Sequence, residues 1–72
     1  MRQPHRVILR NKAVVLSFFT AQAADLARQA NEAEREGKDW RARDLWALAR
    51  DTAPADAFTK SYCSEHAEAR AA

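Results

Sequence analysis

The sequence predicts an all-α protein built from three helices, and three observations support this fold class. The 72-residue chain contains one glycine and two prolines among many alanine, arginine, glutamate and leucine residues, a composition that favours helices. Apolar residues recur three and four positions apart over much of the first half. Two tryptophans follow the single glycine closely, and a short helix can present such side chains to a facing helix.

The recurring apolar residues predict a long first helix over residues 12–36. They form a heptad-like seam: Leu16, Phe19, Ala23, Leu26, Ala30 and Ala33. Asn11 is the expected N-cap of this helix. Gly37 is expected directly after its C-terminus, where glycine adopts the left-handed conformation at little cost.

Two shorter helices are expected to fold back on the first, over residues 39–53 and 55–69. Asp39 can cap the second helix, and Pro54 separates it from the third. Trp46 is expected to insert against the alanine-rich half of the first helix, because small residues leave room for an indole. The predicted core is Leu26, Ala30, Ala33, Leu45, Trp46, Ala49 and Phe58.

So small a chain has a thin hydrophobic core and usually needs a disulfide, a metal or a partner to stabilise its fold. Cys63 is the only cysteine, so no disulfide can form within the chain. The bulky half of the long helix carries more apolar surface than the two return helices could cover. We therefore expect a dimer or higher homo-oligomer that pairs through Val15, Leu16, Phe18 and Phe19.

Positive charge is concentrated at the N-terminus. Arg2, Arg6, Arg10 and Lys12 precede the first acidic residue, Asp25. This pattern divides the chain into a basic arm, residues 1–11, and a single helical domain, residues 12–72. Such an arm can contact nucleic acid phosphates or an acidic protein face, and it can also be a solvated end.

The N-terminal segment partly resembles a signal peptide, with a basic head, a short apolar run and small residues at 21 and 23. Ser17 and Thr20 interrupt that run, and the apolar pattern continues beyond it, so we expect a cytoplasmic protein. No apolar stretch approaches 18 residues, which predicts no transmembrane helix.

The residues that could carry chemistry are few. Cys63 and His66 share a helix face, but a zinc site needs about four ligands, and this pair supplies two. The same pair lacks a fixed acid that would orient the histidine as a catalytic base. A single glycine rules out a glycine-rich phosphate loop. We expect no enzymatic activity, cofactor or metal.

Residues 30–53, ANEAEREGKDWRARDLWALARDTA, carry a family resemblance. Their order of glycine, aromatic, alanine and Leu-Trp resembles the ANR family of small bacterial regulators, the AraC negative regulators, and is similar to the PerC-type activators. The similarity extends loosely over residues 26 to 67. A comparable pattern occurs in tetratricopeptide helix pairs, although one such unit cannot form a solenoid.

The resemblance implies a regulator of transcription that binds another protein, either an AraC-type activator or the histone-like nucleoid-structuring protein. Such regulators are encoded on mobile genetic elements and in enteric pathogens, where they control virulence. Because tryptophan, tyrosine and arginine dominate binding hot spots, the expected partner-binding residues are Trp40, Arg41, Arg43, Arg50, Tyr62 and His66. Two alternatives remain open: a regulator that binds DNA directly through the basic arm, and an anti-defence inhibitor protein.

Overall fold

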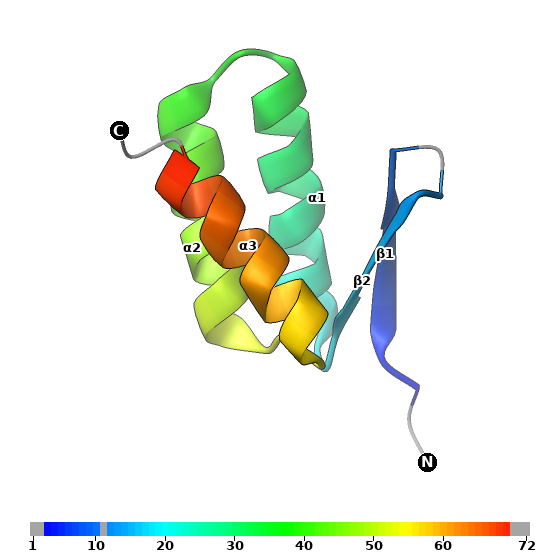
Figure 1. Cartoon of the computed structure of the whole chain (residues 1–72). Helices are drawn as coiled ribbons and strands as arrows, with labels where there is room; N and C mark the ends of the chain where they lie inside the picture. The colour runs from blue at the N-terminus through cyan, green and yellow to red at the C-terminus, as the bar shows by residue number, and fades with distance from the viewer. Residues whose placement is uncertain (1–2, 11, 70–72) are drawn as a thin grey trace.

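A computed structural model describes residues 3–10 and 12–69 and contains both strands and helices. Two strands precede three helices (Figure 1): β1 (His5–Leu9), β2 (Val14–Phe18), α1 (Ala21–Arg35), α2 (Asp39–Thr52) and α3 (Ala57–Ala69). The expectation of an all-α protein was therefore wrong. The three helices are present, but the segment expected to begin a long helix forms a β-hairpin.

The hairpin pairs β1 with β2 in antiparallel register, with His5 opposite Phe18 and Leu9 opposite Val14. Buried residues alternate along both strands, with Val7 and Leu9 on β1 and Leu16 and Phe18 on β2. This period of two places those four side chains on the face that packs against the helices. The expected basic arm thus contains a core strand.

α1 begins at Ala21, nine residues later than expected. Thr20 caps it: the backbone N–H of Ala23 donates to the Thr20 hydroxyl oxygen at 3.1 Å. The expected cap, Asn11, lies outside the described residues. The expected end is confirmed, because Gly37 has a φ of +77° and the Lys38 N–H reaches back to the Ala33 carbonyl at 2.9 Å.

Hydrogen bonds join β2 to the connection between α2 and α3 and to the first turn of α3. Ser17 N–H donates to the Thr59 hydroxyl at 2.9 Å, and Ala55 N–H donates to the Ser17 carbonyl at 2.8 Å. Phe19 N–H donates to the Ala53 carbonyl at 2.8 Å. The α2–α3 connection therefore lies along β2 as a short third segment. Thr59 is fully buried, so this junction belongs to the interior.

The helices pack closely because their buried residues are almost all small. Those residues are Ala23, Ala24, Ala27, Ala30 and Ala33 on α1, Ala42, Trp46 and Ala49 on α2, and Thr59, Cys63 and Ala67 on α3. Trp46 is the one large side chain among them, so the prediction that it is a core residue is confirmed.

Of the other residues predicted to lie in the core, some are buried and others are not. Ala30, Ala33 and Ala49 are buried as expected, whereas Leu26 and Leu45 are partly buried and pack against the core from its margin. Phe58 was expected in the core and instead exposes 55% of its surface near the start of α3. α3 begins at Ala57, where Asp56 accepts the Thr59 N–H at 2.8 Å, and its buried face carries Thr59 and Cys63 instead.

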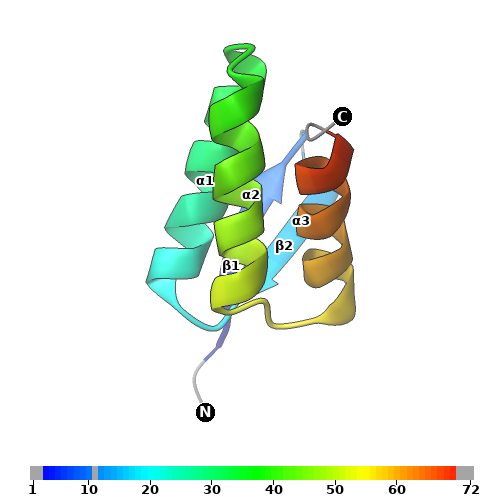
Figure 2. The ribbon, with the colours of Figure 1, turned by 90° about the vertical axis from the view of Figure 1, so that its left-hand side faces the viewer.

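Two views show how the elements are arranged. α1 and α2 form an antiparallel pair joined at Gly37, and α3 crosses beside α2 (Figure 1). Turned by 90°, the molecule shows the hairpin behind the helices, so that α2 and the hairpin lie on opposite sides (Figure 2). Within residues 3–10 and 12–69, no helix has the length and apolar character needed to cross a membrane.

Candidate functional sites

The outer face of α2 displays a large aromatic side chain to solvent. Trp40 exposes 77% of its surface, and the guanidinium carbon of Arg43 lies 4.9 Å from the centre of its ring. Two turns further along the helix, Leu48 is 52% exposed. We call the exposed residues Trp40, Arg41, Asp44 and Leu48 the α2 outer face. An exposed tryptophan beside an arginine is typical of a protein-binding hot spot.

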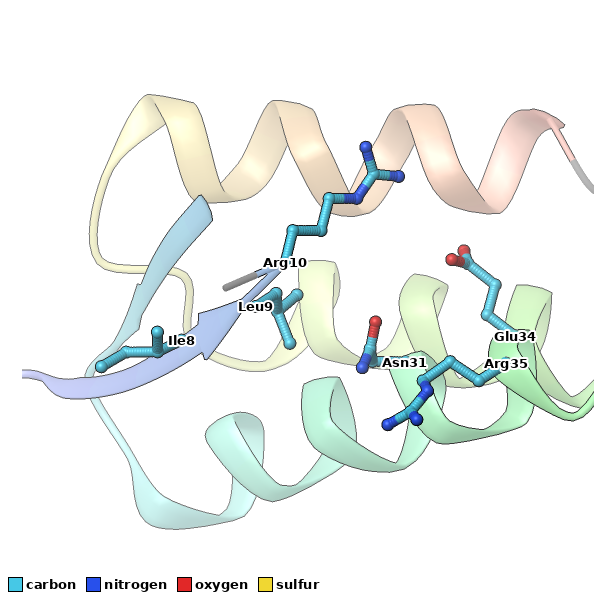
Figure 3. A pocket seen from close by; sticks show the side chains of 6 residues that line it. All are labelled: Ile8, Leu9, Arg10, Asn31, Glu34 and Arg35. Carbon is cyan, nitrogen blue, oxygen red and sulfur yellow. The ribbon is translucent and has the colours of Figure 1, made fainter. Parts of the chain in front are cut away.

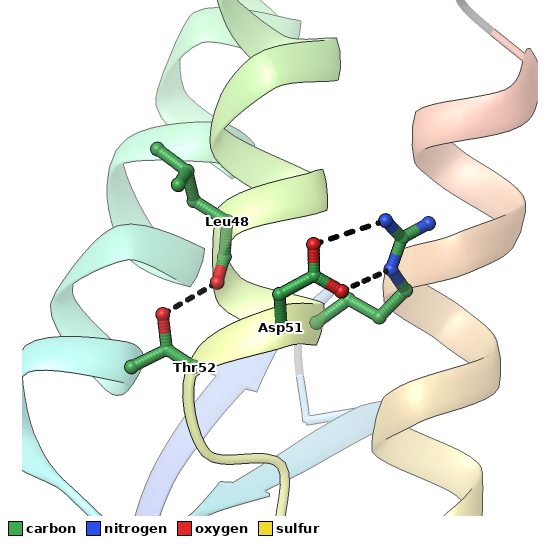
Figure 4. Close-up of polar contacts among 4 residues, drawn as sticks. Leu48, Asp51 and Thr52 are labelled. Atoms are coloured by element: carbon green, nitrogen blue, oxygen red, sulfur yellow. Dashed lines mark hydrogen bonds and ion pairs between the residues drawn. The ribbon is translucent and has the colours of Figure 1, made fainter.

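The arginines predicted to bind a partner have local acidic neighbours. Arg43 contacts Asp44 at 3.0 Å, and Arg50 contacts both carboxylate oxygens of Asp51, at 2.9 and 3.2 Å (Figure 4). The hydrogen bond and charge of Asp51 raise the pKa of Arg50, and Arg50 in turn lowers the pKa of Asp51. Exposed pairs of this kind contribute little to stability, so both arginines are available to a partner.

The last turn of α2 carries another local contact. The Thr52 hydroxyl donates to the Leu48 backbone carbonyl at 2.6 Å (Figure 4). The bond joins a threonine hydroxyl to the backbone carbonyl four residues earlier in the same helix, an arrangement that Ser and Thr side chains often adopt. It leaves the Leu48 side chain on the surface.

Tyr62 and His66 do not lie on the α2 outer face, although the sequence grouped them with Trp40. They belong to a partly buried cluster between the three helices. His66 Nδ1 is 2.7 Å from Glu34 Oε1, and Trp46 Nε1–H donates to the same oxygen at 3.0 Å. Of the predicted partner-binding residues, Trp40 and Arg41 therefore lie on the α2 outer face, Tyr62 and His66 lie in this cluster, and the half-buried Arg43 and Arg50 belong to neither group.

This group, which we call the Glu34 cluster, comprises Glu34, Trp46, Tyr62 and His66. The Tyr62 ring stacks on His66 with 4.1 Å between centroids, and it meets Trp46 edge-on at 5.5 Å. Burial raises the pKa of Tyr62, while the nearby Arg10 opposes that shift. Because Trp46 donates to the carboxylate and the rings pack around it, the cluster links all three helices.

Cys63 is one turn from His66 but lies in an environment that suppresses thiol reactivity. Its side chain is fully buried, and burial raises its pKa to about 11. The thiolate is the reactive form of cysteine, so this thiol is not an activated nucleophile. Among residues 3–10 and 12–69, no three His, Cys, Asp or Glu side chains gather as a metal site would require.

An open pocket of about 590 Å³ lies between the end of β1 and the second half of α1 (Figure 3). Its lining residues are Ile8, Leu9, Arg10, Asn31, Glu34 and Arg35. It combines an apolar wall with two guanidinium groups, an amide and a carboxylate. Glu34 belongs both to this pocket and to the cluster beneath it.

The surface around this pocket is rich in positive charge. Arg6, Arg10 and Lys12 lie on the hairpin, and residues 3–10 and 12–18 contain no acid. Arg28 of α1 reaches the hairpin, where its Nη2 donates to the Arg6 carbonyl at 3.3 Å. The basic segment that the sequence indicated is thus a folded, two-stranded basic surface.

The residues expected to mediate oligomerisation lie on different sides of the hairpin and its following turn. Leu16 and Phe18 are fully buried within the chain, so they are not available to a second copy. Val15 and Phe19 expose 41% and 68% of their surfaces. The hairpin therefore buries Leu16 and Phe18 and leaves Val15 and Phe19 on the surface.

Sequence reasoning missed the pocket, because its two walls meet only once the hairpin forms. Nothing in the sequence indicated that Ile8 and Leu9 would lie beside Asn31 and Arg35. The available signal for the hairpin was the spacing of two between the apolar residues Leu16 and Phe18, which is typical of a strand. No family model, curated protein or solved structure among those compared matches this chain.

Proposed function

We propose that this protein is a small, non-enzymatic, cytoplasmic regulator of transcription that acts by binding another protein. The observation that carries the binding role is the exposure of Trp40, at 77%, with Arg43 beside its ring. Burying an exposed tryptophan is energetically favourable, and a partner that covers Trp40 would gain this free energy on binding. The transcriptional role rests on the resemblance of residues 30–53 to the ANR family.

Trp40 adds little to the fold, which makes its role testable. Most of its ring is outside the core, whereas Trp46 fills the interior. Substitutions at Trp40 should therefore change binding without changing stability.

We expect Trp40→Ala and Arg43→Glu each to weaken partner binding by about tenfold or more, equivalent to about 1.4 kcal/mol. The tagged protein would be co-purified from its native host, and the identified partner would then be titrated against each variant. Circular dichroism and melting temperature should stay near those of the unmodified chain.

Phe58→Ala is the matched control, because Phe58 is a similarly exposed aromatic residue on α3. It should bind the partner normally. Normal binding by both α2 variants would remove this face from consideration. A co-purified partner that belongs to a defence system rather than to transcription would favour the anti-defence alternative.

The basic hairpin supports a second candidate function, direct binding to DNA. A two-stranded ribbon fits the major groove, and Arg6, Arg10 and Lys12 can contact phosphates. If the hairpin binds DNA, the logarithm of affinity for a labelled duplex should fall against the logarithm of salt concentration with a slope of about −3. Arg6→Ala should reduce that slope by about one. A duplex that does not bind at low salt would exclude this function.

A further inference from the structure

The outer edge of β1 has backbone groups directed away from β2. Ser17 bonds through its N–H to Thr59 and through its carbonyl to Ala55, so both of its backbone groups point away from β1. Arg6 is opposite Ser17, and Ile8 is opposite Val15. In an antiparallel ladder these are non-hydrogen-bonded pairs, so Arg6 and Ile8 direct their N–H and C=O groups to the open edge.

The contact of Arg28 with Arg6 agrees with that assignment. The guanidinium donates to the Arg6 carbonyl, which must therefore face α1 rather than β2. Among residues 3–10 and 12–69, none is hydrogen-bonded to the Ile8 backbone on this edge. An edge with such groups accepts a further strand.

The side chains along this edge define what that strand should contain. Arg6 and Ile8 are exposed and follow one another on the outer face of β1, and the exposed Arg10 lies in the turn directly after the strand, with a φ of +49°. Cross-strand neighbours of opposite charge stabilise a ladder, as do paired apolar residues. The complementary strand therefore has an acidic residue opposite Arg6, an apolar residue opposite Ile8 and a second acidic residue two positions further, beside the turn that holds Arg10.

The same charges oppose pairing between two copies of this chain. An antiparallel β1–β1 ladder centred on Ile8 would bring Arg6 of each copy close to the turn that holds Arg10 of the other. Like charges directly opposite each other destabilise such a pair. The pocket bounded by Ile8, Leu9 and Asn31 adds space for a side chain of the incoming strand.

From this geometry we propose that β1 is a docking edge for an extended acidic peptide of a partner protein, which adds to the hairpin as an antiparallel third strand. The peptide has the pattern acidic-x-apolar-x-acidic. Its apolar residue lies opposite Ile8 and exchanges two backbone hydrogen bonds with it. This edge and the α2 outer face lie on opposite sides of the molecule (Figures 1 and 2), so the proposal does not depend on the function proposed for Trp40.

The direct test uses a fluorescein-labelled peptide with the sequence Ser-Glu-Thr-Val-Thr-Glu-Ser and fluorescence anisotropy. We expect saturable binding below about 1 mM, and at least tenfold weaker binding of the peptide in which both glutamates are replaced by lysine. Absence of binding at that concentration, or equal affinity for the two peptides, would overturn the proposal.

Backbone methylation separates strand addition from simple charge attraction. In an antiparallel third strand, the valine N–H bonds to Ile8, whereas each threonine N–H points away. N-methylation of the valine should weaken binding by at least tenfold, and N-methylation of either threonine should not. Equal effects at the valine and the threonines, or no effect at either, would contradict the docking geometry.

Three protein variants complete the test. Ile8→Pro removes the edge N–H at a position where an edge strand tolerates proline, and Arg6→Glu reverses a charge; both should weaken binding by about tenfold or more. Lys60→Glu makes the same charge change on α3 and should have no effect. Circular dichroism would verify folding, and the methylated peptides decide the matter if Ile8→Pro fails to fold. If duplex DNA displaced the peptide, and if Ile8→Pro bound the peptide as tightly as the unmodified chain, the edge would bind phosphate instead.

Discussion

Replacing Trp46 with alanine should remove most of the folding free energy of the protein. Its indole is fully buried, and it is the one large side chain among the buried residues of the three helices. Deleting a buried tryptophan costs about 3–5 kcal/mol, because the surrounding helices relax only partly into the cavity. Small domains retain about 5 kcal/mol in total, so this loss removes most of the folding free energy.

The loss should exceed the effect of the missing volume alone. Trp46 Nε1–H donates to Glu34 Oε1, and the Tyr62 and His66 rings pack against the indole. Removing the indole leaves a partly buried carboxylate without one of its donors, which carries its own cost. The variant therefore weakens the contact that holds α1 and α3 against α2.

Trp46→Phe distinguishes the two contributions. It keeps an aromatic ring in the interior and removes the donor, so its cost should lie near the roughly 1.5–3 kcal/mol typical of a hydrogen bond to a charged group. Urea denaturation followed by circular dichroism would measure both variants. A melting curve for Trp46→Ala that overlays that of the unmodified chain would mean that the indole is outside the core.

The helical part of the fold was predictable because its pattern is local. Gly37 ends α1, and Ala42, Trp46 and Ala49 repeat at helical spacing, so the α1–α2 pair follows from nearby residues. α3 begins two residues later than expected, after Asp56 caps it. Phe58 was misplaced because α3 packs on the core through the face that carries Thr59 and Cys63, and Phe58 lies outside that face.

The hairpin was not predictable in the same way, because its apolar residues fit two periods. Leu16 and Phe19 are three apart, as in a helix, whereas Leu16 and Phe18 are two apart, as in a strand. The interaction that favours the strand is distant: Ser17 bonds to Thr59, 42 positions later. Local propensity cannot register such a contact. The pocket and the β1 edge depend on the hairpin, so they were missed with it.

The two candidate surfaces differ in how far the sequence indicated them. Trp40 could be identified as exposed, since it falls outside the apolar face that contains Trp46. The β1 edge requires knowledge of which backbone groups point outward, and only the pairing of Ser17 with the α2–α3 connection reveals that. Side-chain patterns predict which faces are apolar, but they do not fix which edge of a short ribbon is open.

Substitution by aspartate should affect stability very differently at two adjacent phenylalanines, Phe18 and Phe19. Phe18 is fully buried beneath the hairpin, whereas Phe19 exposes 68% of its surface. An aspartate in place of Phe18 would leave a cavity and bury a carboxylate without a partner, and each change alone is strongly destabilising. An aspartate at position 19 reaches water directly.

We therefore expect Phe18→Asp to lose its helical circular dichroism signal, with a cost above the 3–5 kcal/mol that truncation to alanine carries. Phe19→Asp should stay within about 0.5 kcal/mol of the unmodified chain, as exposed substitutions usually do. Light scattering on the same samples tests the earlier expectation that this segment joins two copies. If Phe18→Asp gave a folded monomer from a larger assembly, Phe18 would be an interface residue and the hairpin would not cover it. Because Phe18 and the Ser17–Thr59 bond belong to one junction, loss of the Phe18 side chain should release the hairpin from α3 and expose the helices that it covers.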